Sequence, residues 1–296
     1  MLELMSELKS APKQLSDEDL LFFEENGYIV FKDVLSKDEL SDIRDAMTRL
    51  CLKACNGYKE GSFTGRKGKP ETPFAGWNLR DKNSNFSVGF EADVDINNAT
   101  NEELSQSYRK LNAYHDQDPV FENFKTHEIC SNYRNQLLGE NSILSQDMAL
   151  SKPAEFGREK PWHQDNAYFT ITPLQQVIGI WVAIDDATIE NGCMHVLPTK
   201  RYNAKAYKHV YVTDCEIDKN DLPLDQTVPV EVPAGGAIFF LGMVPHQTPP
   251  NHSQFSRRAL QWHYRGADTV FENDQDYREI FKTVDGRPAA CSAASE

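Results

Sequence analysis

Hydrophobic positions near the start of the chain recur at helical spacing behind two capping signals. Ser16 is followed three residues later by Asp19, and Ser36 by Glu39, so each serine can begin a helix with a capping box. The second apolar stripe consists of Leu40, Ile43, Met47 and Leu50. Residues at this spacing share one face of a helix, which predicts that this helix packs on a larger body.

The pattern then weakens and returns before the middle of the chain. Residues 56–100 are rich in Gly, Asn, Pro and Ser and lack sustained periodicity, which predicts a long irregular connection of the kind that often serves as a lid. Helical spacing resumes between residues 101 and 139, with Asp118-Pro119 as a plausible helix start. Residues 15–140 are therefore expected to form a mostly helical support with an irregular lid at 56–100.

The second half has the pattern of β-strands. Apolar and polar residues alternate from Leu144 to Leu150, whereas Val177–Ile184 and Ala237–Leu241 are nearly continuous apolar runs. Prolines and Gly235-Gly236 separate the runs without an intervening helical pattern, so the strands should pair antiparallel. A jelly-roll or cupin-like barrel over residues 141–270 fits better than a βαβ fold. We expect a single mainly β domain over residues 1–296, with flanking helices and a C-terminal tail at 271–296.

Composition narrows the class of protein. The chain has 296 residues, 40% of them hydrophobic, and a formal net charge of −14, which disfavours binding to nucleic acid. Residues 1–13 lack a signal-peptide pattern, and no apolar run reaches the length of a membrane span. The six cysteines have neither zinc-site spacing nor the density of a disulfide scaffold. We expect a cytoplasmic protein with reduced thiols, bound to neither nucleic acid nor membrane.

A His-x-Asp motif carries the most chemical information. Residues two apart in a strand project to one face, so His163 and Asp165 can both reach one metal ion while Trp162 and Gln164 point away. The motif alone is common, and a metal site requires a third ligand.

His246 is the candidate for that ligand. It follows the buried run Ala237–Leu241, where a tight turn can direct its ring inward. Two histidines and one carboxylate form the facial triad of non-haem Fe(II) oxygenases, which leaves three coordination positions open. A structural zinc site would fill four positions and prefers cysteine, so the set favours catalytic iron.

Two adjacent arginines could serve a 2-oxoacid co-substrate. Such a co-substrate chelates iron through its keto and C1 carboxylate oxygens, and its distal carboxylate then needs a cation such as the planar fork of arginine. Arg257 and Arg258 enter the strand pattern 259–264, and only one of them can face the barrel interior. A pair of surface arginines beside a turn is the alternative.

These residues resemble the phytanoyl-CoA dioxygenase-like family of Fe(II)/2-oxoglutarate-dependent oxygenases. The resemblance is carried by His163–Asp165, Gly179–Asp186, Glu190–Met194, His246 and Asn251–Arg257. It extends loosely from about residue 15 and so covers most of the chain.

The resemblance implies a double-stranded β-helix, with Fe(II), 2-oxoglutarate and O₂ as cofactor and co-substrates. The implied metal ligands are His163, Asp165 and His246. The implied 2-oxoglutarate contacts are Arg257, Thr248, Trp181, Met148 and Lys110. The lysine matches less closely, because its neighbourhood aligns only with a small gap.

The expected substrate is a small, anionic organic molecule. Six basic residues in the segment 58–82 outnumber three acidic ones, which suggests a lid that attracts an anion, although a solvated loop is equally compatible. The candidate substrate contacts are Gln146, Arg66, Lys67, Lys69, Phe74 and Trp77. The family resemblance alone favours acyl-CoA, but a fold does not define a substrate.

Several alternatives stay open at this point. Hydroxylation is the expected reaction, but desaturation and oxidative cyclisation begin with the same hydrogen abstraction. A cupin-like protein that binds a metal or ligand without turnover is the alternative function, and a zinc-dependent hydrolase or isomerase is a third. The other histidines are expected to be structural or exposed, except that His263 shares the strand parity of Arg257 and could line the pocket.

Overall fold

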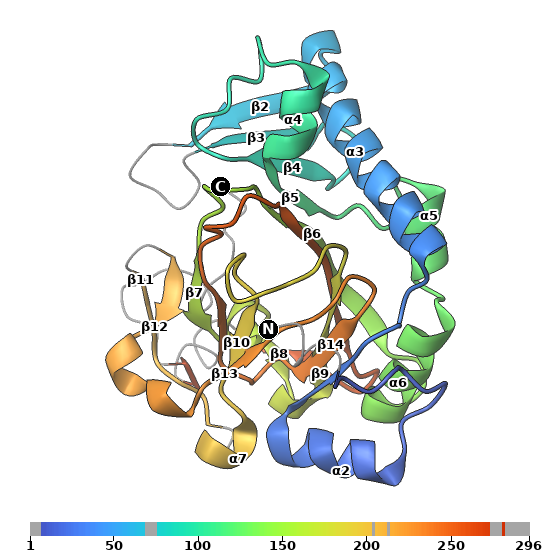
Figure 1. The fold of residues 1–296 in the computed structure, drawn as a ribbon, viewed down its shortest axis with the longest axis vertical. Coiled ribbons are helices and arrows are strands. Elements are labelled where there is room, and N and C mark those ends of the chain that lie inside the picture. Colours follow the sequence, from blue (N-terminus) through green and yellow to red (C-terminus); the bar gives the residue numbers. More distant parts are fainter. Residues whose placement is uncertain (1–6, 69–75, 203–204, 212–213, 273–279, 282–296) are drawn as a thin grey trace.

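The computed structural model describes residues 7–68, 76–202, 205–211, 214–272 and 280–281. Two capped helices open the described chain (Figure 1). Ser16 and Ser36 each cap a helix through a complete capping box, as the sequence predicts. The helices are α2 (Asp17–Asn26), α3 (Lys37–Glu60), α4 (Asn101–Ser107), α5 (Pro119–Phe124), α6 (Glu128–Leu138) and α7 (Thr199–Tyr202). The single-turn 3₁₀ helices are η1 (Asp165–Tyr168), η2 (Leu174–Gln176), η3 (Lys219–Asp221) and η4 (Leu224–Gln226).

Most of the strands belong to one large antiparallel sheet and one smaller sheet. The large sheet has the order β1-β14-β9-β16-β6-β5-β4-β3-β2, and the smaller one the order β13-β10-β15-β7. The strands of the large sheet are β1 (Tyr28–Phe31), β2 (Phe63–Lys67), β3 (Trp77–Asp81), β4 (Ser87–Phe90), β5 (Tyr108–Asn112), β6 (Ile143–Lys152), β9 (Val177–Ala183), β14 (Ala237–Leu241) and β16 (Arg257–Arg265). The smaller sheet consists of β7 (Lys160–His163), β10 (Met194–Val196), β13 (Val228–Val230) and β15 (His246–Thr248).

Two further strand pairs complete the described fold. They are β8 (Ile171–Thr172) with β17 (Val270–Phe271), and β11 (His209–Tyr211) with β12 (Cys215–Ile217). The fold is the predicted double-stranded β-helix, a jelly roll with flanking helices. One apolar cluster joins residues of the large sheet, such as Trp181 and Phe240, to residues of the small sheet, such as Met194 and Val230, so the two sheets pack face to face.

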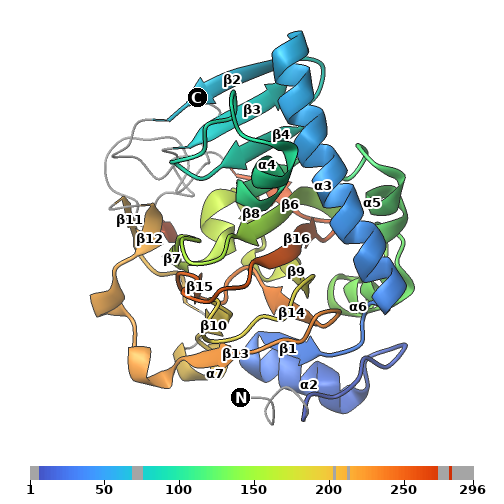
Figure 2. The ribbon, with the colours of Figure 1, turned by 45° about the horizontal axis from the view of Figure 1, so that its top comes forward.

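The structure corrects the prediction for residues 56–100. Helix α3 continues to Glu60, and β2, β3 and β4 then form an antiparallel meander that β5 joins to β6 (Figures 1 and 2). The strand β2 has no alternating pattern of apolar and polar residues, because it buries only Phe63 and its other side chains face solvent. The predicted helical region 101–139 likewise contains β5 between α4 and α5.

Side chains of the large sheet alternate between two environments. Met148, Gln261 and Trp181 lie opposite one another in register on β6, β16 and β9, and they face the barrel interior. Their neighbours Ala149 and Leu260 belong to the core beneath the helices. Because the period of a strand is two, every other position on β16 is directed into the barrel.

The expected reduced thiols are found at four cysteines and not at a fifth. Cys51, Cys55, Cys130 and Cys193 are free and buried. Cys215 is disulfide-bonded, so the expectation fails there. In the part of the chain that the structure describes, no helix combines the length and the apolar character that crossing a membrane requires.

Gly192 is predicted to be indispensable to the turn that precedes β10. Its φ is +81°, and a Cβ there would lie 2.2 Å from the carbonyl oxygen of Pro249. Gly61 has φ +86° but nothing within 4 Å of its Cβ position, so it is a matched control for backbone conformation. Gly61→Ala should lower the free energy of unfolding by about 1–2 kcal/mol. Gly192→Ala should cost roughly a further 1–3 kcal/mol from the backbone clash. Urea denaturation measures both, and equal losses would contradict the prediction.

Candidate metal and co-substrate site

Three buried side chains converge between β7 and β15. His163 ends β7, Asp165 begins η1 rather than continuing the strand as predicted, and His246 begins β15 opposite His163. Asp165 Oδ1 lies 3.3 Å from His163 Nε2 and 3.7 Å from His246 Nε2. One ligand atom from each residue lies within 4.8 Å of the others, so the three can hold one metal ion.

Backbone carbonyls define the tautomers of both histidines. His163 Nδ1 lies 2.8 Å from the carbonyl oxygen of Pro161, and His246 Nδ1 lies 3.0 Å from that of Val244. A carbonyl oxygen only accepts, so each Nδ1 donates its proton and each Nε2 keeps a lone pair that faces Asp165. This outer hydrogen bond is the usual support of a metal-binding imidazole.

The site keeps its donors in the protonation states that a metal requires. Burial raises the pKa of the Asp165 carboxyl, but the electrostatic influence of His263 and His246, together with hydrogen bonds from His163 and His263, outweighs this effect and holds the pKa well below 3.8. Burial, followed by the proximity of His163, lowers the pKa of His246 to about 4. At neutral pH Asp165 is therefore a carboxylate and His246 a neutral imidazole, the forms in which these groups bind a metal.

The residue between the two motif positions anchors the loop from behind. The Gln164 side chain donates to the carbonyl oxygen of Met243 at 2.6 Å and accepts from the backbone N–H of Tyr207 at 2.8 Å. Its backbone N–H donates to His209 Nε2 at 3.1 Å, while His209 Nδ1 donates to the carbonyl of Tyr207 at 3.0 Å. Gln164 thus points away from the metal ligands, as strand alternation predicts, and holds them in place.

Arg257 is a buried cation with unused donors. It is 1% exposed, its Nη2 donates to the carbonyl oxygen of Gly192 at 3.2 Å, and its Cζ lies 5.3 Å from the ring centroid of Trp181. Nε and Nη1 have no hydrogen-bond partner among the residues that the structure describes. Burial lowers the pKa of Arg257 to about 10, so it is charged at neutral pH.

The neighbouring arginine is used differently. Arg258 Nε and Nη2 bind the carboxylate of Asp185 at 2.8 and 2.9 Å, on the helix side of the sheet. Of the two arginines, Arg257 is therefore the one directed inward. A buried guanidinium with two N–H groups unpaired among the described residues can bind the distal carboxylate of 2-oxoglutarate through two hydrogen bonds.

Other predicted contacts also line the interior. Met148 is buried, and Gln146 is half-buried opposite His263. Thr248 is buried two positions beyond His246 on β15. Lys110 lies on β5 opposite Leu150, and burial, aided by Lys160 and Arg109, lowers its pKa to about 8.

The structure does not bring the predicted basic segment to the site. Arg66 and Lys67 are exposed on β2, the edge strand that three others separate from β6. Trp77 packs against Tyr58 of α3, with ring centroids 5.8 Å apart. Lys69 and Phe74, like most of the predicted tail 271–296, lie outside the described residues. A substrate lid at β2 and β3 gains no support from this placement.

Two neighbours of the triad were not assigned a role from sequence. His263 Nε2 lies 2.8 Å, and Gln261 Nε2 3.3 Å, from Asp165 Oδ2. Both occupy positions of β16 that face inward like Arg257, and this alternation is the signal that could have identified them. From the sequence it indicates only that His263 could line the pocket.

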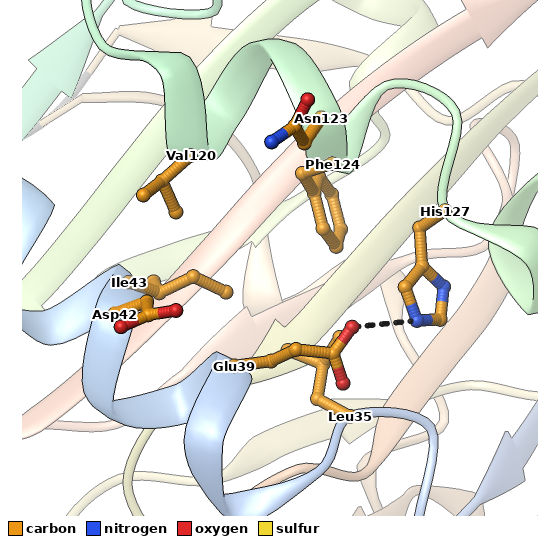
Figure 3. A pocket seen from close by; sticks show the side chains of 8 residues that line it. All are labelled: Leu35, Glu39, Asp42, Ile43, Val120, Asn123, Phe124 and His127. Carbon is orange, nitrogen blue, oxygen red and sulfur yellow. Dashed lines mark ion pairs between the residues drawn. The ribbon is translucent and has the colours of Figure 1, made fainter.

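A separate cavity lies outside the barrel. It has a volume of about 240 Å³ and is lined by α3, α5 and the start of α6 (Figure 3). His127 Nε2 lies 3.4 Å from Glu39 Oε1 across it, and Phe124 packs against Trp262 on the helix face of β16. The sheet therefore separates this cavity from the triad.

A jelly roll with an interior two-histidine, one-carboxylate set defines the class of non-haem iron oxygenases. The family model described as phytanoyl-CoA dioxygenase (PhyH) matches residues 23–259. The chain belongs to this family and is a non-haem iron, 2-oxoglutarate-dependent dioxygenase.

A curated relative agrees with this membership, and solved structures share the fold. The chain is similar to phytanoyl-CoA dioxygenase 1 of Oryza sativa subsp. japonica, with 30% identity over 84% of this chain and 88% of that protein. It shares the fold of EctD from S. alaskensis, solved with 2-oxoglutarate and 5-hydroxyectoine, at a TM-score of 0.62 and 20% identity over 99% of this chain and 89% of that one. It also resembles the α-ketoglutarate-dependent carbocyclase SnoK from nogalamycin biosynthesis, at a TM-score of 0.63 and 17% identity over 97% of both chains.

His209 should make stability depend on pH. Burial lowers its pKa from 6.5 to about 3, so the unfolded chain binds the proton more tightly and stability falls as the pH drops below 6.5. Between pH 7.5 and 5.5 we expect the wild type to lose roughly 1.4 kcal/mol that His209→Gln, which keeps an acceptor for Gln164, does not lose. Denaturant unfolding at both pH values measures this, with the exposed His252→Gln as control. Equal slopes for wild type and His209→Gln would refute it.

Proposed function

We propose that His163, Asp165 and His246 would hold Fe(II), and that the protein hydroxylates a small, anionic organic substrate with release of succinate and CO₂. The observation that carries the proposal is the convergence of two Nε2 lone pairs and one carboxylate oxygen in a buried site. Three protein ligands leave three positions of an octahedral ion open.

We further propose Arg257 as the anchor for the distal carboxylate of 2-oxoglutarate. Its Nε and Nη1 are the unpaired donors, and a planar guanidinium can give a carboxylate two parallel hydrogen bonds. Thr248, Trp181, Met148 and Lys110 complete the proposed pocket for this co-substrate. In this scheme Arg257 Nη2 donates to the carbonyl oxygen of Gly192, so that the guanidinium is oriented before 2-oxoglutarate binds.

The protein's part in the reaction is binding and orientation. Bound Fe(II) with 2-oxoglutarate supplies the activation of O₂, with one oxygen atom going to succinate and the other to the substrate. The carbonyls of Pro161 and Val244 hold the two imidazole rings so that their Nε2 atoms face one point. Burial excludes water and strengthens the charge-assisted bond between Arg257 and its ligand.

An anionic substrate is supported by the cations near the interior wall. Burial lowers the pKa of Lys110 on β5, and Lys160 on β7 and Arg109 on β5 are close enough to lower it further. Asp214, which pairs with Lys160, is a partial counter-charge for these cations. Gln146 is the proposed neutral substrate contact. We place the reaction in the cytoplasm.

Measuring succinate release with panels of organic acids, amino acids and acyl-CoA thioesters would identify the substrate class. Stimulation solely by neutral or cationic compounds would overturn the anionic assignment.

Loss of either histidine ligand should abolish turnover. His163→Ala and His246→Ala each remove one of three protein donors, and we expect Fe(II) binding to weaken and Fe(II)-dependent succinate release from 2-oxoglutarate to disappear. Anaerobic metal titration and succinate quantification check both effects. The control is His252→Ala, at an exposed position outside the triad. Near-wild-type succinate release by the ligand variants would contradict the assignment, and no release by the wild type would favour a non-catalytic cupin-like binding protein.

The two adjacent arginines should differ sharply in their effect on 2-oxoglutarate. Arg257→Gln removes a charge-assisted contact worth on the order of 1.5–3 kcal/mol, so the KM for 2-oxoglutarate should rise roughly ten- to more than a hundredfold. Arg258→Gln breaks the ion pair with Asp185 and should lower thermal stability while changing this KM little. Steady-state kinetics at saturating iron measures both. A larger KM effect at Arg258 would show that the inward-facing residue is not the anchor.

A further inference from the structure

The carboxylate of Asp165 has its two oxygens committed to different partners. Oδ1 is the oxygen that faces both ligand histidines, at 3.3 and 3.7 Å. Oδ2 faces β16, where His263 Nε2 lies at 2.8 Å and Gln261 Nε2 at 3.3 Å. Side chains from distant parts of the chain thus contact one carboxylate. Oδ1 faces His163 and His246, and Oδ2 faces β16.

The two nitrogen atoms that face Oδ2 also lie close to each other, with Gln261 Nε2 3.1 Å from His263 Nε2. The amide nitrogen of Gln261 can only donate, and a nitrogen 2.8 Å from a carboxylate oxygen must carry the proton. His263 is fully buried, and its Nδ1 has no partner among the residues that the structure describes. The hydrogen bond to Oδ2 therefore uses Nε2, and His263 is the closer of the two donors, at 2.8 Å against 3.3 Å for Gln261.

We propose that His263, supported by Gln261, is a positioning residue that holds Oδ2 of Asp165, so that Oδ1 would be the oxygen presented to a bound Fe(II). The inference rests on the proposed iron site. A carboxylate whose second oxygen is free can turn and bind a metal through both oxygens. With Oδ2 held on the sheet side, more of the coordination sphere of a bound metal would be left to 2-oxoglutarate and O₂.

The position of His263 in the fold makes it suited to this role. It lies in the middle of the large sheet, where β16 pairs with β6 on one side and β9 on the other, and its register partners are Gln146 and Gly179. The ring of Phe169 packs against it with centroids 4.9 Å apart. A side chain held by two strands and an aromatic neighbour loses little freedom when it binds the carboxylate, so the contact orients Asp165 before metal arrives.

The test compares anaerobic Fe(II) binding by the full-length wild type with binding by three variants. His263→Phe keeps a planar ring and removes the donor, and His263→Gln restores a donor. Tyr264→Phe is the control, because it is adjacent on β16 but faces the helix-side core. We expect His263→Phe to weaken Fe(II) binding roughly ten- to a hundredfold, the usual effect of losing an outer-shell partner. His263→Gln should recover most of the loss, and Tyr264→Phe should match the wild type.

A second readout separates positioning from general destabilisation. Addition of 2-oxoglutarate to the anaerobic Fe(II) protein gives a visible charge-transfer band when it chelates the metal. In His263→Phe this band should shift or weaken even at saturating iron, and more succinate should form per oxidised substrate, whereas a merely structural role would leave both unchanged in the folded fraction. A wild-type band and affinity in His263→Phe would overturn the inference.

The two proposals fail in different ways. If the wild type binds no Fe(II), the proposed function fails; if the wild type binds and His263→Phe binds equally well, only the positioning role fails. Should His263→Phe not fold, Gln261→Met decides the question, since it removes the other Oδ2 donor at nearly constant volume. We expect that variant to bind Fe(II) more weakly than the wild type with an altered band, and no change in either would overturn the inference.

Discussion

The alternation of side chains along β16 is the constraint on which the site depends. It directs Arg257, Gln261 and His263 into the barrel and sends Arg258 to Asp185 on the opposite face. Both faces are buried, so a shift by one residue would exchange a cationic pocket for an apolar core and leave charges without partners. The register of one central strand therefore determines both the proposed co-substrate pocket and the contact to Asp165, the proposed carboxylate ligand.

Charge is concentrated in the interior, and its desolvation is offset locally. Asp165 is surrounded by three imidazoles and an amide, while Arg257 has donors that no described residue uses. A buried cation without a partner is unfavourable by itself, and an anionic ligand that supplies the missing acceptors removes this cost. The buried charge of Arg257 thus destabilises the ligand-free protein and would add to its affinity for a dicarboxylate.

The sequence was informative where pattern and chemistry coincide locally. Capping boxes, continuous apolar strands and the His-x-Asp motif each depend on residues close together in the chain, and the structure has all three. The meander β2–β4 has no clear strand pattern in the sequence, because β2 and β3 are largely exposed and β4 has only four residues; pairing and contacts with α3 stabilise these strands. The contact between His263 and Asp165 spans 98 residues, so parity indicates the direction of the side chain but not its partner.

The strands of the meander take the place of the expected basic loop. A basic loop would act as a mobile lid, whereas β5 is hydrogen-bonded to β6 on one side and β4 on the other. Lys110 is therefore presented from a sheet that also carries Met148 and Gln146, and its position follows from strand pairing rather than from loop closure. Selectivity for an anion would then be built into a rigid wall, which lowers the conformational entropy lost on binding. The long helix α3 packs along the outside of this wall, against β2, β3 and β4.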